Sequence, residues 1–351
     1  MNSRTGILHS VVHFLHHHFI WVIIGSYLVA AVSPSLGLWI RHVQLGSFAI
    51  HTTKIEISLP PIMLALILFN AGLGVRTREL RQLLHNPKLL LIGVVGNIAT
   101  PLMFIIALSY AMGVWHNPEE VQQILMGLAL VASMPIAGAS AAWSQNANGN
   151  LAVSLGLVLM TTTLSPLLTP AVLHAVGFVT TGDYAEDLHE LARDGVTDFL
   201  ALWVVLPSLL GILAHKLLGE ARLDSAKSWL RLSNYVILIL LNYSNAALTL
   251  PKVIKNPDFD FLAVIIVIVT GLCLTAFAVG FGLARMLRTD RASMISLMFG
   301  LGMNNNGTGL VLASMALSDH AEIMIPIIFY NLTQHMVAAA IDRYWVQATD
   351  V

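Results

Sequence analysis

The sequence predicts an all-α membrane protein with ten transmembrane helices, built from two inverted five-helix repeats. Three observations predict this fold: the apolar composition, the row of hydrophobic segments, and a motif repeated at a fixed offset. Of 351 residues, 56% are hydrophobic and only 11% are charged, and the mean hydropathy is +0.76. Soluble domains carry about 25% charged residues, so this chain requires lipid as its solvent. The net charge of −1 gives no indication of a nucleic-acid partner.

Each predicted span is an apolar run close to the ~20 residues that cross a bilayer core. In chain order the spans are 19–40, 58–75, 88–112, 121–146, 150–177, 198–218, 230–250, 260–285, 290–318 and 321–345. An acidic segment, 179–197, separates the fifth span from the sixth. We therefore interpret 1–178 as the first repeat, 179–197 as a linker and 198–351 as the second repeat.

A short motif relates the two halves. Residues 66–70 are LILFN, and residues 238–242 are LILLN, which gives an offset of 172. The same offset places each span of the first half opposite one of the second, and it places Pro135–Gly138 opposite Gly307–Leu310. An odd number of spans per repeat makes the second repeat enter the membrane from the opposite side, as in many secondary transporters.

The basic residues predict the orientation. Ten spans place both termini on one side, and that side holds thirteen of the eighteen Lys and Arg residues, against five on the other. Cytoplasmic loops are the ones rich in Lys and Arg. We therefore expect a protein of the cell membrane with both termini in the cytoplasm.

Spans four and nine contain residues that break helices. Span four has Pro135 and Gly138, and span nine has Gly302, Gly307 and three consecutive asparagines. Proline removes a backbone donor, glycine lowers the cost of leaving the helix, and paired breaks in two repeats indicate a midplane binding site. Half-helix N-termini suit an anion. The candidate substrate-binding residues are Pro135, Ala137, Gly138, Asn305, Asn306 and Asn331. The alternative is that the asparagines only bond neighbouring helices.

Motifs of enzymes are absent. The sequence has no phosphate-binding P-loop and no His-Glu-x-x-His zinc motif, so we expect no catalytic residue and no organic cofactor. Its one cysteine, Cys273, lies in an apolar run. His335 follows Asn331 by one helical turn and is a candidate proton relay. The N-terminal histidines, such as His13 and His17, fit the start of an interfacial helix better than a metal site.

The segments 149–154 (GNLAVS), 165–170 (SPLLTP), 302–305 (GMNN) and 330–332 (YNL) resemble the bile acid:sodium symporter family. The resemblance covers about residues 87–344. It implies ten helices divided into a panel and a core domain, with helices four and nine broken and crossing. It also implies secondary transport of organic anions, in most members coupled to sodium.

The resemblance assigns candidate sodium ligands residue by residue: Ser140, Ser154, Asn97, Met303 and Asn304. The sequence departs from the family pattern at three other ligand positions. Ala141 replaces an asparagine, Val158 replaces a threonine, and Gly300 replaces the glutamate that serves both sodium sites. Hard cations gain much from an anionic oxygen ligand, so these departures favour weakened sodium sites or none.

The resulting hypothesis is a secondary active transporter of a small organic anion that works by alternating access. A first alternative keeps the fold but runs without sodium, as a facilitator or a proton-coupled carrier. A second alternative is a receptor that binds its ligand without transporting it. The sequence sets no oligomeric state, so a monomer and an oligomer both remain open.

Overall fold

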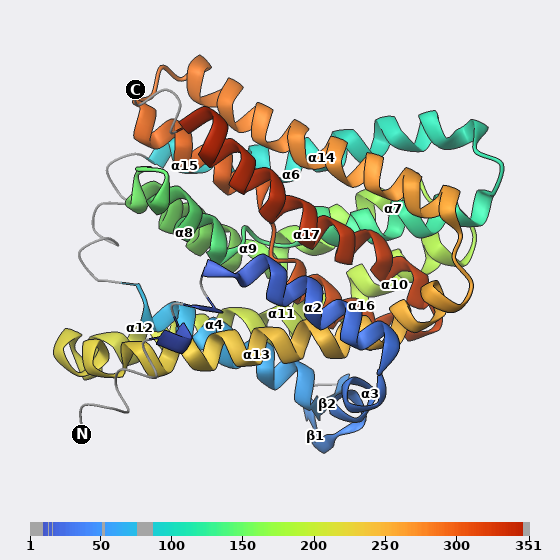
Figure 1. Cartoon of the computed structure of the whole chain (residues 1–351). Coiled ribbons are helices and arrows are strands. Elements are labelled where there is room, and N and C mark those ends of the chain that lie inside the picture. Colours follow the sequence, from blue (N-terminus) through green and yellow to red (C-terminus); the bar gives the residue numbers. More distant parts are fainter. Residues whose placement is uncertain (1–9, 13, 16, 51–52, 76–86, 347–351) are drawn as a thin grey trace. The chain divides into compact units, whose positions relative to one another are not determined.

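The structure is a computed structural model that describes residues 10–12, 14–15, 17–50, 53–75 and 87–346, and it is mostly helical (Figure 1). In these residues, six helices are long and apolar enough to cross a membrane, or seven if the bent pair Phe19–Val32 and Ser35–His42 is one span. The all-α, multi-pass class is therefore present. The full number of ten spans stays a prediction, because other apolar helices are shorter, such as Leu59–Leu73, or interrupted.

The chain forms two compact units. Unit 1 consists of Met1–Thr77 and Ala201–Pro257, and unit 2 consists of Arg78–Leu200 and Asp258–Val351. Each unit thus combines a segment from the first half of the sequence with one from the second. This grouping by contact differs from the division into repeats at 1–178 and 198–351, which stays a prediction.

Unit 1 contains the following elements: α2 (Phe19–Val32), α3 (Ser35–His42), β1 (Gln44–Ile50), β2 (Thr53–Ser58), α4 (Leu59–Leu73), the π-helical turn η2 (Ala201–Val205), α12 (Leu206–Leu218) and α13 (Glu220–Lys255). The long helix α13 packs against α2, α3 and α4, and α4 also packs against α12. These contacts bury the apolar faces of the unit's helices against one another.

The first predicted span, 19–40, is wrong as a single helix. The chain bends by 91° between α2 and α3, at Ser33 and Pro34. A residue before proline is pushed out of the helical region, and Ser33 has φ −132 and ψ 77. An antiparallel hairpin, β1–β2, follows α3. The sequence analysis did not predict this hairpin.

Unit 2 contains α6 (Pro87–Ala111), η1 (Met112–Val114), α7 (Pro118–Ser133), α8 (Gly138–Asn146), α9 (Leu151–Gly177), α10 (Asp183–Asp194), α11 (Val196–Leu200), α14 (Phe259–Met286), α15 (Arg291–Gly302), α16 (Asn306–Ala316), η3 (Ser318–Ile323), α17 (Met324–Ile341) and η4 (Asp342–Val346). Within it, α14 packs against α6, α15 and α17, while α9 packs against α6, α7 and α8 (Figure 1).

The acidic segment predicted as a linker is largely helical. It forms α10, which packs along α9 and buries Leu188 and Leu191. Its apolar side chains lie on one face and its charged ones on the other, the pattern of a surface helix. The segment therefore belongs to unit 2 as a packed element.

Both predicted interruptions are present. Helix α7 ends at Ser133 and α8 begins at Gly138; α15 ends at Gly302 and α16 begins at Asn306. Applied to the ends of the first break, the offset of 172 would end α15 at residue 305 and start α16 at residue 310. The observed break comes three to four residues earlier, so one offset does not hold along the whole chain. One helical turn separates the two registers.

Two glycines set the approach of α4 to α12. A Cβ added to Gly211 would collide with the carbonyl oxygen of Phe69, and one added to Gly72 with the carbonyl oxygen of Ser208. Since both obstacles are backbone atoms, a side chain cannot rotate away to relieve the clash. The two helices can pack this closely only without side chains at these positions.

We expect Gly211→Ala to lower the free energy of unfolding by roughly 1–3 kcal/mol, the usual cost of overpacking a tight contact. The measurement is the temperature at which the detergent-solubilised protein is lost from its size-exclusion peak. Gly25→Ala is the matched control, since a Cβ there meets nothing within 4 Å. Equal midpoints for the two variants would contradict this account of the α4–α12 contact.

Candidate functional site

The two interrupted helices meet through their unwound backbone. Ile136 and Asn304 form an isolated antiparallel bridge. The Ala137 N–H donates to the Met303 carbonyl at 2.9 Å, and the Asn305 N–H donates to the Pro135 carbonyl at 2.8 Å. Each break thus satisfies backbone groups that the other break leaves open. We call this meeting point, residues 134–138 and 302–307, the crossing.

Side chains from two further helices complete the crossing. The Ile136 N–H donates to Thr161 Oγ1 of α9 at 3.1 Å, and the Asn304 N–H donates to Gln334 Oε1 of α17 at 3.0 Å. The sequence analysis did not place Thr161 here, because its hydroxyl also bonds its own helix, at the Leu157 carbonyl (2.8 Å). Only the fold shows that a remote N–H uses the same hydroxyl.

Asn304 is a structural residue of the crossing. Its side chain donates to the Val131 carbonyl at 2.8 Å and accepts from Asn97 Nδ2 at 2.9 Å. Asn331 lies nearby and accepts from Gln334 Nε2 at 3.4 Å. Asn97, Asn304 and Asn331 are all buried. The first residue of the asparagine run therefore fits the interhelical bonding alternative.

The other two asparagines differ from Asn304. Asn305 caps α16, where its Oδ1 accepts from the Thr308 N–H at 3.4 Å, and its side chain is only half-buried. Asn306 is 1% exposed. In the part of the chain that the structure describes, neither side-chain polar atom of Asn306 has a hydrogen-bond partner, and neither does Thr308 Oγ1. Unpaired buried polar groups are costly, so these atoms are available to a ligand or water.

The half-helix α8 begins at the exposed residue Gly138. A Cβ at Gly138 would meet nothing within 4 Å, so open space lies next to this helix start. Pro135 and Ala137, the other first-break candidates, are buried. Of the predicted substrate residues, Gly138 and Asn305 are therefore the accessible ones.

The crossing has no formal charge of its own. Residues 121–150 and 292–318 contain no Asp, Glu, Lys or Arg. The N-terminus of a helix carries roughly half a positive charge, and both α8 and α16 begin at the crossing. No side chain of these segments neutralises that partial charge. The arrangement is electrostatically suited to an anionic group.

The candidate sodium ligands are mostly engaged with protein groups. Asn97 and Asn304 bond each other, and the Met303 carbonyl accepts from Ala137. Ser154 donates to Ser144 at 2.8 Å, the start of a serine chain that continues to Ser296 (3.0 Å) and the Asn150 carbonyl (2.8 Å). Among the five candidates, Ser140 has a buried hydroxyl with no partner in the described residues.

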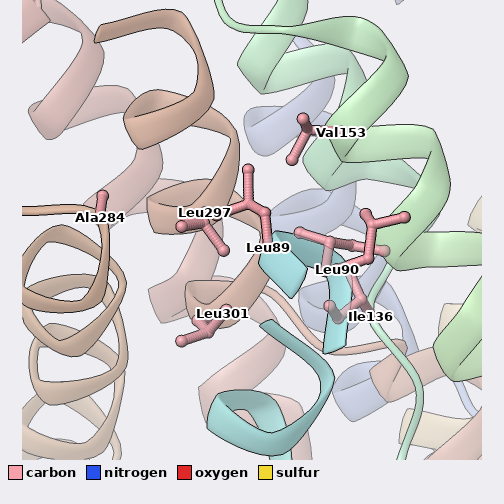
Figure 2. Close-up of a cluster of buried hydrophobic side chains, with 8 residues drawn as sticks. Leu89, Leu90, Ile136, Val153, Ala284, Leu297 and Leu301 are labelled. Carbon is pink, nitrogen blue, oxygen red and sulfur yellow. The ribbon is translucent and has the colours of Figure 1, made fainter. Parts of the chain in front are cut away.

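An apolar cluster lies beside Val158 and Gly300, two of the three positions that depart from the family's sodium ligands. Its buried members are Leu89, Leu90, Ile136, Val153, Leu157, Ala284, Leu297 and Leu301 (Figure 2). Val158 packs against the cluster, and a Cβ on Gly300 would lie 3.0 Å from Leu157 Cδ1 and 3.8 Å from Ile136 Cδ1. A glutamate at position 300 would have to displace leucine. The residues present do not fit the symporter-type sodium sites.

Comparison with known proteins gives two curated relatives from Bacillus subtilis (strain 168). The chain is 27% identical over 281 residues to YbaS, which is described as an uncharacterized protein. The aligned residues make up 80% of this chain and 86% of the relative. It is 24% identical over 342 residues to YocS, described as an uncharacterized sodium-dependent transporter, which covers 97% of this chain and 94% of the relative. Both are similar to this chain along most of their length.

A family model matches almost the entire chain. The model is that of the SBF-like CPA transporter family, and it matches residues 17–346. The match includes both interruptions and the asparagine run, and it confirms the resemblance to bile acid:sodium symporters at the level of the family. The chain therefore belongs to the SBF-like CPA transporter family and is a multi-pass membrane transporter.

Proposed function

We propose that this protein is a secondary transporter of a small organic anion, that it works by alternating access, and that it does not depend on sodium. The observation on which the proposal rests is the crossing. Two half-helices, α8 and α16, begin there, and no acidic side chain in these segments opposes the partial positive charge of their N-termini. Such termini bind carboxylates and other anions, and broken helices mark the substrate site of many transporters.

An inverted-repeat architecture is part of the proposal, and the packing supports it. In unit 1, α2 packs against α13 and α4 packs against α12. If the repeats are related, α2 corresponds to α12 and α4 to α13, so these two contacts are equivalent. In unit 2, α8 packs against α9 as α16 packs against α17. Thr161 and Gln334 likewise hold the central residues of the two breaks, Ile136 and Asn304.

We further propose ten membrane passes in the cell membrane, with both termini in the cytoplasm. The distribution of Lys and Arg supports this orientation. Arg76, Arg78 and Arg81 belong to that argument, but they lie outside the described residues. In alternating access, one unit moves against the other while the substrate stays at the crossing.

A proton-coupled carrier is the alternative that a specific contact favours. His335 of α17 is buried, and its Nδ1 accepts from Trp143 Nε1 of α8 at 3.3 Å. A neutral histidine that accepts at Nδ1 carries its proton on Nε2. Protonation at Nδ1 would break this bond and so change the contact between α8 and α17. Uptake driven by a pH gradient, and lost in His335→Gln, would favour this alternative.

The substrate is best sought by a thermal-shift screen of organic anions in sodium or potassium buffer, since a ligand that binds the folded state raises its apparent stability. Anions that stabilise the protein are then tested for uptake in proteoliposomes. Binding without uptake would favour the receptor alternative. No stabilisation by any anion would count against the proposed substrate class.

We expect Asn305→Ala to reduce uptake by at least about tenfold, the effect of losing one hydrogen bond to a charged group. The variant also loses the α16 cap, which costs ~1 kcal/mol. Asn305→Ser is the matched variant, because serine restores a capping oxygen but not an amide donor. Low uptake by both variants, with normal stability of Asn305→Ser, would support a substrate role. Full uptake by Asn305→Ser would show that only the cap matters.

We expect uptake to change by less than about twofold when sodium replaces potassium at constant ionic strength, because the missing oxygens at Ala141, Val158 and Gly300 together weaken a site by well over tenfold. The experiment is a sodium titration of the initial uptake rate into proteoliposomes. Saturable activation by sodium in the low-millimolar range would overturn this expectation. Such activation would agree with the description of the relative YocS as a sodium-dependent transporter.

A further inference from the structure

Unit 1 contains a cavity that has no part in the crossing. Its volume is about 280 Å³, and it lies among the C-terminal end of α4, the end of α12 and the first half of α13. The lining residues are Asn70, Leu73, Gly74, His215, Glu220, Leu223, Asp224, Lys227, Leu230, Arg231 and Asn234. The proposed transport mechanism assigns no role to it.

Specific hydrogen bonds hold the walls of this cavity. His215 of α12 donates from Nδ1 to the Leu73 carbonyl at the end of α4, at 2.7 Å. Asn70 Nδ2 donates to Asn234 Oδ1 at 2.8 Å and so ties α4 to α13. Gly219 joins α12 to α13 with φ +77, a backbone conformation that favours glycine. The inner wall is therefore defined by polar groups rather than by loose packing.

Four charged side chains line the cavity from one face of α13. Glu220 and Asp224 precede Lys227 and Arg231, and steps of three and four residues keep all four on the same side of a helix. They are exposed, and none forms an ion pair within the described residues. Acidic and basic side chains thus lie close together on the helix without an ion pair between them. A ligand that carries both signs of charge fits this arrangement better than a simple anion or cation.

The position of the cavity along α13 places it at the membrane surface. Helix α13 has 36 residues and is therefore about 54 Å long, whereas the bilayer core is only about 30 Å thick. The charged residues 220–231 occupy its first three turns, so they lie beyond the hydrocarbon. Trp229, which lies between Lys227 and Arg231 in sequence, is 64% exposed, and tryptophan is enriched at the level of lipid head groups.

We propose that this cavity binds a phosphoethanolamine group. The phosphate would lie against Lys227 and Arg231, since guanidinium binds phosphate with two parallel hydrogen bonds. The primary ammonium would donate to Asp224 and Glu220. Asp224 and Lys227 are three residues apart, about 4.5 Å along the axis, so one compact zwitterion reaches both. Phosphatidylethanolamine in the membrane is one source of this group, and soluble phosphoethanolamine is the other.

The test compares probes on the full-length protein in detergent. The probes are phosphatidylethanolamine, phosphatidylcholine, phosphatidylglycerol and soluble O-phosphoethanolamine, and the readouts are the melting temperature and the lipid-bound mass in native mass spectrometry. We expect phosphatidylethanolamine to bind at least about tenfold more tightly than the other two lipids. Phosphatidylcholine has no ammonium N–H, and phosphatidylglycerol has no ammonium. Stabilisation by O-phosphoethanolamine alone would identify the soluble source.

The variants separate the cavity from general surface charge. Lys227→Gln with Arg231→Gln should weaken binding by at least about tenfold, since a single lost charge-assisted hydrogen bond already has an effect of about that size. Asp224→Asn should reduce the preference for ethanolamine over glycerol. The matched control is Lys216→Gln with Arg222→Gln, which removes the same charge from exposed sites outside the lining. All are surface changes, so their lipid-free melting temperatures should equal that of the parent protein.

Equal binding of the three lipids by the parent protein, together with no stabilisation by O-phosphoethanolamine, would overturn the proposal. So would equal losses in the cavity variant and in the control variant. Either outcome is independent of transport, because neither readout measures uptake. The inference therefore stands or falls separately from the proposed function.

Discussion

The requirement that dominates this structure is that backbone N–H and C=O groups inside a membrane find partners within the protein. Two helices of unit 2 are interrupted, and each interruption frees such groups. The bridge between Ile136 and Asn304, with the two flanking bonds from Ala137 and Asn305, pairs the breaks with each other. Each break therefore supplies partners for backbone groups that the other leaves open.

Much of the surrounding packing serves this pairing. Thr161 and Gln334 bring α9 and α17 to the crossing by accepting its central N–H groups. Thr169 Oγ1 donates to the Ser133 carbonyl at 2.6 Å, where α7 ends. Gly309 allows α16 to pass α7, since a Cβ there would lie 3.2 Å from Met134 Cγ. The result is a hydrogen-bonded scaffold around two helix starts that have no charged side chain in their own segments.

The same contacts affect which ions the protein can use. Oxygens that could coordinate a cation instead accept protein hydrogen bonds, as in the Asn97–Asn304 pair and the Ser154–Ser144 pair. The side chains of Leu157 and Ile136 lie beside Gly300. In the proposed sodium-independent carrier, direct hydrogen bonds and apolar packing take the place of cation coordination. This supports a carrier whose core is held together without a coupling cation.

The sequence by itself determined the features that depend on local chemistry. Apolar composition identified the solvent as lipid, and Pro135, Gly138 and Gly302 located both interruptions, because helix breaking is a property of the residues themselves. The family followed from the same motifs. Tertiary structure alone decided which distant residues form hydrogen bonds and which helices pack together. Which oxygen Asn304 bonds, how Thr161 reaches Ile136, and that α10 packs rather than links all depend on segments far apart in sequence. The grouping into two units likewise follows from packing between distant segments. The bend at Pro34 has a local cause, because proline pushes Ser33 out of the helical region, but the sequence analysis did not use that signal.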